Sequence, residues 1–292
     1  MRPYFIVNPI AGGGKALEKF ERVKQYFAKK RADFSYVMTD RAGQSTALAE
    51  EAYEKGERYI VAVGGDGTIN EVAACLYKKD DVVMGICPFG TGNDFARVLD
   101  IPTDPDEAAG VLAEGTPRPV DMGLADDKPF INVGGIGFDV DVVINTEKFK
   151  KRFHGMIPYL FGIVQSMAHL KGIPVKITAD GKQTSEDILL CAVANGSHFG
   201  GGMAVAPEAD ATDGLFDVCV IRRVGLLQFL HLLPKFVKGR HIGRKPIDYF
   251  RASEVSIDCG RRPMQLDGEL GEYAPVTFRL VPGALKIMLK GS

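Results

Sequence analysis

The stretch YIVAVGGDGTINE, from Tyr59 to Glu71, decides how the first part of this chain folds. Its first five residues form an apolar run rich in β-branched side chains, which is typical of a strand buried on both faces of a parallel sheet. The segment Gly64–Thr68 then breaks the strand, and apolar residues at helical spacing follow as far as Leu76. Glycines admit a ligand close to the backbone, and N–H groups at a helix start point at negative charge. We therefore expect an anion site here.

Asp66 is the unusual residue of this turn. A carboxylate that faces a phosphate repels it, unless a cation lies between them or the carboxylate handles a proton or a hydroxyl. Asp66 therefore indicates a metal–nucleotide complex and phosphoryl transfer. The alternative is a tight strand–helix turn in which Asp66 is only the N-cap of its helix.

Composition and charge bound the class of protein. The chain has 292 residues, enough for two domains, and its 46% hydrophobic and 25% charged residues are typical of a globular protein. The net charge of −1 predicts no nucleic-acid partner. The five scattered cysteines indicate neither a disulfide framework nor a zinc site. We expect a cytoplasmic protein without a signal peptide, because the N-terminus runs directly into a strand-like segment.

The first third of the chain alternates strands with helices, which predicts a doubly wound parallel α/β sheet. In such sheets ligands bind beyond the carboxyl ends of the strands. The loops at those ends should therefore converge on one crevice. The strands are expected at Tyr4–Val7, Phe34–Thr39, Tyr59–Val63 and Val82–Cys87, and the loops are Asn8–Lys15, Thr39–Asp40, Gly64–Thr68 and Gly90–Asp94.

After Asp121 successive strands with hairpin-like turns predict an antiparallel second domain, a β-sandwich, interrupted by helical stretches at Val140–Lys171 and Leu226–Val237. The strands are expected at Val120–Leu124, Pro129–Gly134, Val175–Ala179, Ile188–Ala194, Leu215–Ile221, Glu254–Asp258, Met264–Leu266, Val276–Leu280 and Ala284–Leu289. We expect an α/β domain over residues 1–121 and a β-rich domain over residues 122–283. The last strand, residues 284–292, could join either domain.

Two further glycine loops could bind phosphate. Asn8–Lys15 departs from the Walker A pattern, because Asn8 stands at the first glycine position and Ala16 follows Lys15. Its backbone could still cradle a phosphate, with Lys15 as a point charge. In Gly90–Asp94, Thr91 could donate to a phosphate, Asn93 could bind sugar or phosphate, and Asp94 could hold a substrate hydroxyl. The alternative for Asn8–Lys15 is a glycine-rich turn with a solvated lysine, and the alternative for Gly90–Asp94 is a capped turn.

Two acidic turns lie in the second half. Asp210, Asp213 and the carbonyl of Leu215 offer the oxygen ligands that hard cations prefer, or they form an ordinary acidic turn. Asp267-Gly268-Glu269 could supply a general base, but from the residues alone a hairpin turn is the favoured interpretation.

Two stretches combine basic and apolar residues without any acidic residue, Lys148–Ala179 and Val218–Ile247. This combination suits an anionic membrane surface. A solvated face over a core helix is the alternative.

Together these motifs resemble the diacylglycerol kinase catalytic family, which includes bacterial diacylglycerol kinases, related lipid kinases, and sphingosine and ceramide kinases. The resemblance extends from Asn8 to Glu269. GGDGT also occurs in the similar NAD kinases, whereas the GTGNDFAR and DGE blocks point to lipid kinases. The motifs are NPIAGGGK, GGDGTINEV, PFGTGNDFAR, SHFGGGMAVAPEADATDGLFDV and LDGE.

The resemblance implies roles for individual residues. Asp66 would act near Mg²⁺ and the γ-phosphate of ATP, and Glu269 would accept the proton of the lipid hydroxyl. Asp210, Asp213 and Leu215 would hold a structural Mg²⁺, and Asp94 and Arg97 are candidate substrate contacts. The predicted ATP contacts are Asn8, Pro9, Ile10, Ala11, Gly12, Lys15, Thr39, Gly64, Gly65, Asp66, Gly67, Thr68, Ile69, Asn70, Thr91 and Asn93.

We therefore expect a bacterial, ATP- and Mg²⁺-dependent lipid kinase, with diacylglycerol as the first choice of substrate and phosphatidic acid as the product. Sphingoid bases, monoacylglycerol, phosphatidylglycerol or a polyprenol remain alternative acceptors. An NAD kinase and a non-catalytic nucleotide-sensing membrane module are the alternative functions. The enzyme would contact the inner face of the membrane peripherally, and a homodimer is common in families of this kind.

Overall fold

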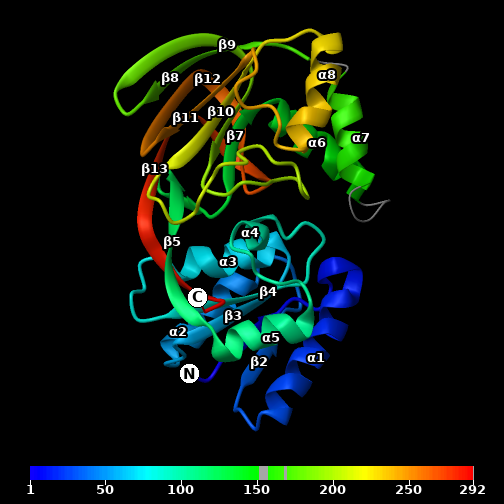
Figure 1. The fold of residues 1–292 in the computed structure, drawn as a ribbon, viewed down its shortest axis with the longest axis vertical. Helices are drawn as coiled ribbons and strands as arrows, with labels where there is room; N and C mark the ends of the chain where they lie inside the picture. The colour runs from blue at the N-terminus through cyan, green and yellow to red at the C-terminus, as the bar shows by residue number, and fades with distance from the viewer. Residues whose placement is uncertain (151–156, 168–169, 292) are drawn as a thin grey trace. The chain divides into compact units, whose positions relative to one another are not determined.

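The computed structural model describes residues 1–150, 157–167 and 170–291. They form two compact units, one of residues 1–122 with 282–292 and one of residues 123–281. Two strands, β5 (Thr116–Ala125) and β13 (Glu269–Leu289), run through both units (Figure 1). Part of the predicted basic stretch, residues 151–156, lies outside the described residues.

The first unit contains a parallel sheet in the order β13-β4-β3-β1-β2. All six residues of β3 are buried, as expected for a strand covered on both faces. The end of β13 joins through the pair Ile287–Met84, so the final strand belongs to this sheet. The other strands are β1 (Tyr4–Val7), β2 (Ser35–Met38), β3 (Tyr59–Gly64) and β4 (Val83–Pro88).

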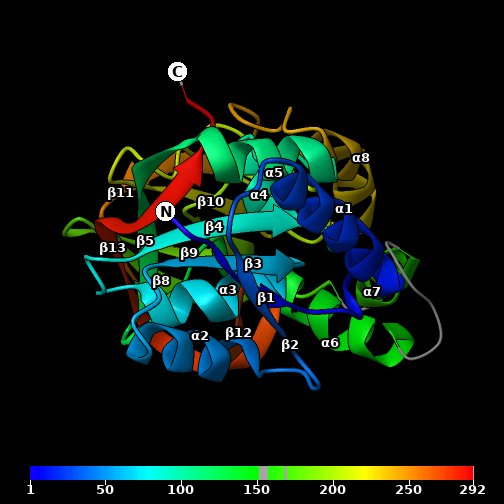
Figure 2. The same ribbon diagram turned by 90° about the horizontal axis from the view of Figure 1, so that it is seen from below.

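Helices cover both faces of this sheet (Figure 2). On one face Phe20 of α1 and Leu112 of α5 pack with Phe5 and Val61 in a single apolar cluster. Helices α2 and α3 lie against the other face. The predicted α/β fold is therefore confirmed. The helical segments are η1 (Ala11–Gly14), α1 (Lys15–Lys29), α2 (Ser45–Glu54), α3 (Asp66–Leu76), α4 (Asp94–Val98) and α5 (Pro105–Glu114).

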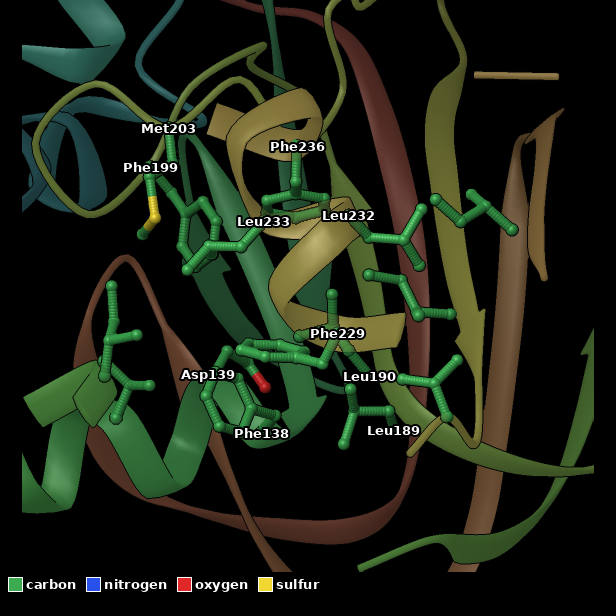
Figure 3. Close-up of a pocket in the computed structure, with 15 residues that line it drawn as sticks. Phe138, Asp139, Leu189, Leu190, Phe199, Met203, Phe229, Leu232, Leu233 and Phe236 are labelled. Carbon is green, nitrogen blue, oxygen red and sulfur yellow. The ribbon is translucent and has the colours of Figure 1, made fainter. Parts of the chain in front are cut away.

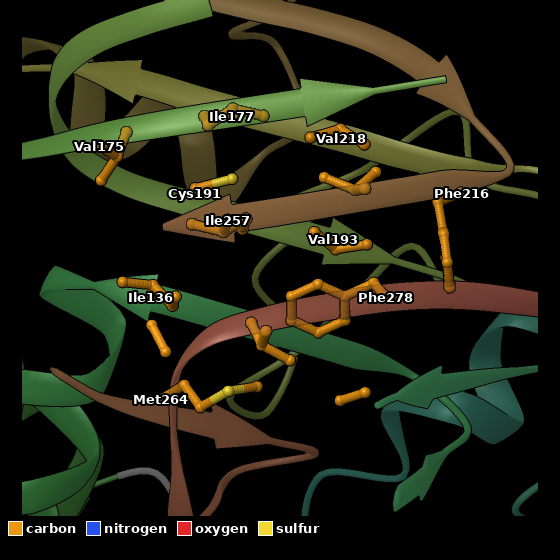
Figure 4. Close-up of a cluster of buried hydrophobic side chains, with 14 of the residues drawn as sticks. Ile136, Val175, Ile177, Cys191, Val193, Phe216, Val218, Ile257, Met264 and Phe278 are labelled. Atoms are coloured by element: carbon orange, nitrogen blue, oxygen red, sulfur yellow. The ribbon is translucent and has the colours of Figure 1, made fainter. Parts of the chain in front are cut away.

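The strands of the second unit pair in antiparallel fashion, as predicted for this half. Strands β7 and β8 each bridge β9 to β12. Apolar side chains of β7–β10, β12 and β13 fill a common core (Figure 4). The strands are β6 (Lys128–Phe130), β7 (Val133–Gly137), β8 (Ile173–Ala179), β9 (Lys182–Ala194), β10 (Phe216–Arg222), β11 (Ile247–Ala252) and β12 (Glu254–Leu266).

The helices that accompany these strands in the described residues are α6 (Phe138–Lys150), α7 (Ile157–Met167) and α8 (Leu226–Val237). Helix α8 has the predicted bounds, whereas β11 has no counterpart in the sequence prediction. The predicted strands at Glu254–Asp258 and Met264–Leu266 are one strand, β12, whose register shifts between Ile257 and Arg262. Of the helices in the described part of the chain, none has the length and apolar character needed to cross a membrane.

Candidate active site

The glycine loops that follow β1, β3 and β4 meet backbone to backbone. A Cβ atom on Gly90 would lie 2.2 Å from the Cα of Gly65, and a Cβ atom on Gly12 would lie 2.5 Å from the carbonyl oxygen of Phe89. Side chains at these positions would push the loops apart. These glycines are therefore needed for the approach of one loop to another, in addition to any approach of a ligand.

Asn8 and Thr68 hold two of these loops together. The Asn8 Nδ2 donates to Thr68 Oγ1 at 3.1 Å, while the Asn8 Oδ1 accepts from the backbone N–H of Ile10 at 3.3 Å. A Cβ atom on Gly64 would lie 2.6 Å from the same Thr68 oxygen. Both side chains, which we predicted to contact ATP, thus position the loops. On the neighbouring strand end, Thr39 is buried and its N–H donates to Val7.

The loop before α1 has the form of an anion cradle. Gly12, Gly13 and Gly14 all have positive φ angles, which favour glycine strongly. Lys15 is exposed and is the first residue of α1, where backbone N–H groups and the helix dipole already attract negative charge. Ile10 is exposed on the same loop. The arrangement could bind a phosphate group.

Asp66 does not cap its own helix. Helix α3 begins at Asp66, and its N-cap residue, Gly65, makes no side-chain cap. The Asp66 carboxylate instead accepts from the N–H of Phe95 in α4 at 3.3 Å. The N-cap alternative is therefore wrong. Burial raises the pKa of Asp66, and hydrogen bonds from backbone N–H groups of residues 93–95 oppose that rise.

Farther along α3, Ile69 is buried. The side-chain oxygen of Asn70 is also buried, and it has no hydrogen-bond partner among the described residues. A buried polar atom of this kind ordinarily has a hydrogen-bond partner, and a bound ligand or a water molecule could supply one to Asn70.

The loop after β4 is closed by Asn93. Its Oδ1 accepts from the N–H of Gly90 at 2.9 Å and its Nδ2 donates to the carbonyl of Gly90 at 3.1 Å. The amide that we predicted to contact the nucleotide therefore closes the turn. Asp94 is buried at the start of α4, and its carboxylate lies 3.9 Å from Arg97. Exposed Thr91 and Arg97 line an open groove of about 520 Å³ that continues to Glu107.

In the second unit, Asp267 and Gly268 form a two-residue hairpin between β12 and β13. Their φ angles of 51° and 84° are those of a type I′ turn. The Asp267 carboxylate accepts from the N–H groups of residues 131–133 at 2.9 Å, which fixes the hairpin on the neighbouring chain segment. The hairpin interpretation of this motif is correct. Glu269 follows as the first residue of β13 and is exposed, so its carboxylate is accessible for proton transfer.

A short chain of hydrogen bonds connects this hairpin to Asp139, which the sequence analysis did not single out. The Gln265 Oε1 accepts from the N–H of Gly268 at 2.8 Å, and the Gln265 Nε2 donates to Asp139 Oδ2 at 3.1 Å. Burial raises the pKa of Asp139 to about 7. The signal that could have found it is an acid directly between two apolar residues, Phe138 and Val140, at the start of a helix.

Asp139 lines an apolar pocket between α6, α8 and strands β9 and β10 (Figure 3). Phe138, Phe199 and Phe229 are among the aromatic side chains of its wall. An apolar cavity with few polar groups is typical of a site for a largely apolar ligand. Asp139 is the one titratable side chain among the pocket residues that the structure describes.

The acidic turn at residues 210–215 presents two carboxylates, those of Asp210 and Asp213. One Asp210 oxygen accepts from the backbone and hydroxyl of Thr212, and one Asp213 oxygen accepts from the N–H of Leu215. The guanidinium of Arg251 lies 3.6 Å from the second Asp213 oxygen. Within the described part of the chain no three His, Cys, Asp or Glu side chains gather at one point. Carboxylate and carbonyl oxygens are the kind of ligand that Mg²⁺ prefers. The guanidinium of Arg251 would compete with Mg²⁺ for the Asp213 carboxylate.

Family models match both halves of this chain. The family model of the diacylglycerol kinase catalytic domain matches residues 2–125, and that of the YegS C-terminal NAD kinase beta sandwich-like domain matches residues 133–289. The chain is 32% identical to a diacylglycerol kinase of Bacillus subtilis, covering 95% of this chain and 92% of that protein. It is 35% identical to a probable YegS-like lipid kinase of Pseudomonas putida, over 86% of this chain and 84% of that protein.

Solved structures show the same fold. A diacylglycerol kinase structure from Bacillus anthracis superposes with a TM-score of 0.77 at 24% identity, covering 99% of this chain and 97% of that one. The yeast NADH kinase superposes with a TM-score of 0.54 at 11% identity, covering 100% of this chain and 84% of that one. The chain is thus NAD kinase-like in fold. It belongs to the diacylglycerol kinase and YegS-like family of lipid kinases, which are phosphotransferases.

Proposed function

We propose that this lipid kinase transfers the γ-phosphoryl group of ATP to the hydroxyl of diacylglycerol and produces phosphatidic acid and ADP. The observation that carries this proposal is the apolar pocket of the second unit. Asp139 in its wall is connected through Gln265 to the hairpin that presents Glu269. An acyl chain needs an apolar site, and the hydroxyl needs a base nearby. The names of the Bacillus subtilis and Mycobacterium tuberculosis relatives support diacylglycerol as the substrate.

The glycine loops of the first unit would bind the nucleotide. Backbone N–H groups of the loops after β1 and β3 and the ammonium of Lys15 would stabilise charge on the phosphates. Asp66, held by the N–H of Phe95, would orient the bound metal–nucleotide complex. Mg²⁺ supplies charge neutralisation on the β- and γ-phosphate oxygens when it is bound.

Glu269 would act as the general base. It takes the proton of the lipid hydroxyl while that oxygen forms a bond to the γ-phosphorus of ATP. The bond from that phosphorus to the oxygen bridging the β- and γ-phosphates breaks, and the electron pair leaves with ADP. Phosphatidic acid, ADP and a protonated Glu269 balance the reaction.

A direct assay tests this proposal. Purified enzyme is incubated with γ-labelled ATP, Mg²⁺ and a panel of lipids in mixed micelles, with NAD as acceptor in a parallel reaction. We expect label in phosphatidic acid. Label in another lipid would reject diacylglycerol as substrate, and label only in the NAD reaction would reject the lipid acceptor.

The base is tested by Glu269→Gln, with Glu272→Gln as a matched control on the same strand. Glu272 pairs with Lys128 and has no assigned catalytic role. We expect Glu269→Gln to lower kcat by at least about 100-fold and Glu272→Gln to leave it nearly unchanged. A Glu269→Gln enzyme with full activity would remove the base assignment.

We also propose that Asp210, Asp213 and the carbonyl of Leu215 hold a structural Mg²⁺ in competition with Arg251. Bound metal should raise the Tm, because it stabilises the folded state alone. Asp213→Asn should abolish the Mg²⁺-dependent rise. The same rise in the variant and the wild type would assign the metal effect to another site.

Peripheral contact with an anionic membrane surface is part of the proposal, since the substrate is a membrane lipid. The homodimer stays a prediction, which light scattering of the purified protein tests.

A further inference from the structure

The apolar pocket beneath α8 is narrow. Its volume is about 50 Å³, whereas sites for small-molecule ligands ordinarily measure about 300–1,000 Å³. Phe229, Leu232 and Phe236 of α8 are buried and form one wall of the pocket (Figure 3). If the pocket takes an acyl chain, as the proposed function requires, an element of its wall must move. Helix α8 is such an element, because one of its faces meets the pocket and the other meets solvent.

The outer face of α8 is apolar, although it is exposed. Leu226, Leu230 and Val237 are 49%, 44% and 41% exposed, and Leu227 is 85% exposed. Leu226, Leu230, exposed Pro234 and Val237 follow one another at spacings of four, four and three residues. They therefore form one stripe along the helix. Leu227 stands beside this stripe. An exposed apolar stripe of this length indicates contact with another apolar phase.

Basic side chains accompany the apolar stripe. Lys235 and Lys238 lie three residues apart in a second stripe next to the first, and the Lys235 ammonium donates to His231 Nε2 at 2.5 Å one turn earlier in the same stripe. The nearby Arg222 and Arg223 pair with acidic side chains of neighbouring strands, so they are not counted. The whole segment Val218–Ile247 contains no acidic residue. Such a pair of stripes complements an anionic lipid surface and is typical of a helix that lies in the membrane interface.

We propose that α8 is a membrane-inserted lid, whose outer leucines enter an anionic bilayer and whose inner aromatic face opens to admit the acyl chain of the substrate. The lipid then passes from the bilayer to the pocket without crossing water. The bilayer is thereby an activator of the enzyme as well as the source of substrate. The proposal rests on the proposed lipid kinase function, and its insertion step is measured without turnover.

Insertion is tested by fluorescence, because the chain contains no tryptophan. Leu227→Trp places a single reporter on the outer face of α8, and Tyr273→Trp places a control on an exposed position of β13. With phosphatidylglycerol-containing vesicles we expect a blue shift for Leu227→Trp and quenching by brominated acyl chains, with neither change for Tyr273→Trp. An unchanged Leu227→Trp spectrum would overturn the proposal. A concentration-dependent blue shift without vesicles would assign this face to a second copy of the chain and would also overturn it.

Activation is tested by the double variant Leu226→Ser/Leu230→Ser, with Tyr273→Ser as control. A leucine side chain that moves from water into the bilayer contributes a favourable transfer free energy, which serine lacks. We therefore expect the vesicle partition coefficient of the double variant to fall at least about tenfold. We expect a similar fall in kcat/KM for long-chain diacylglycerol in vesicles, and a nearly unchanged kcat/KM for a dispersed short-chain diacylglycerol.

Equal loss on both substrates would show damage to the site and reject the lid, and wild-type activity on vesicles would reject it too. If the wild-type enzyme phosphorylates neither substrate, the proposed function fails, while the fluorescence result still decides insertion.

Discussion

At Asp66, burial and hydrogen bonding act on the pKa in opposite directions, with burial the larger effect. We expect Asp66→Asn to lower kcat by at least about 100-fold, because the amide lacks the negative charge needed next to a metal–nucleotide complex. The amide oxygen can still accept from Phe95, so the Tm should change little. Steady-state kinetics and a thermal melt measure both. Asp33→Asn, at an exposed position, serves as control. A kcat within twofold of the wild type, as in the control, would contradict the role of Asp66.

Asp139 gives a pH dependence of stability with a definite sign. Its pKa is raised to about 7 by burial, above the ordinary 3.8. The folded state therefore binds more protons than the unfolded state between these values. The stabilising contribution of Asp139 is complete below the ordinary pKa of 3.8 and declines as the pH rises from there towards 7. It is lost above about pH 7.

The substitution Asp139→Asn should remove this slope, because asparagine is neutral at every pH and can still accept from Gln265. Between about pH 5 and pH 8 we expect the wild type to lose on the order of 2–3 kcal/mol of unfolding free energy relative to the variant. Chemical denaturation at the two pH values measures the difference. Parallel pH profiles for the two proteins would show that Asp139 does not titrate in this range.

At the scale of elements, the glycine loops after β3 and β4 pack directly on each other. We expect Gly90→Ala to destabilise the fold by about 2 kcal/mol or more, because its Cβ would lie 2.2 Å from the Cα of Gly65. Gly67→Ala is the matched control for stability, since its Cβ would meet no atom within 4 Å. Urea denaturation of both variants measures the difference. Equal stability would mean that the loops separate without cost.

The pattern of residues predicted β3, its glycine turn and α3 because all three lie within one short stretch. It also predicted the bounds of α8, whose apolar spacing is regular. It missed β11, because Ile247–Ala252 mixes charged, aromatic and apolar residues and is fixed by its pairing with β10. The nucleotide contact of Asn93 stays a prediction, and the conformation of the loop, which no local spacing indicated, turns this amide onto Gly90.

For the whole molecule, net charge and local charge give different expectations. The net charge is −1, so the chain as a whole should not be drawn to an anionic surface. The acid-free segment Val218–Ile247 predicts attraction all the same. We expect binding to phosphatidylglycerol-containing vesicles to weaken several-fold between about 0.05 and 0.5 M NaCl, because salt screens exposed charges. Co-sedimentation measures this, and salt-independent binding would leave the apolar stripe as the sole cause.

The sequence by itself determined the alternation of strands and helices in the first unit, the hairpin at Asp267 and the family motifs, because each depends on residues near one another in the chain. Only the tertiary structure decided that Asp66 accepts from Phe95, that Asp267 holds residues 131–133, and that Asp139, in the wall of an apolar pocket, accepts from Gln265. These contacts join residues 29 to 136 positions apart. Such contacts follow from strand register and packing, which no local spacing of residues records.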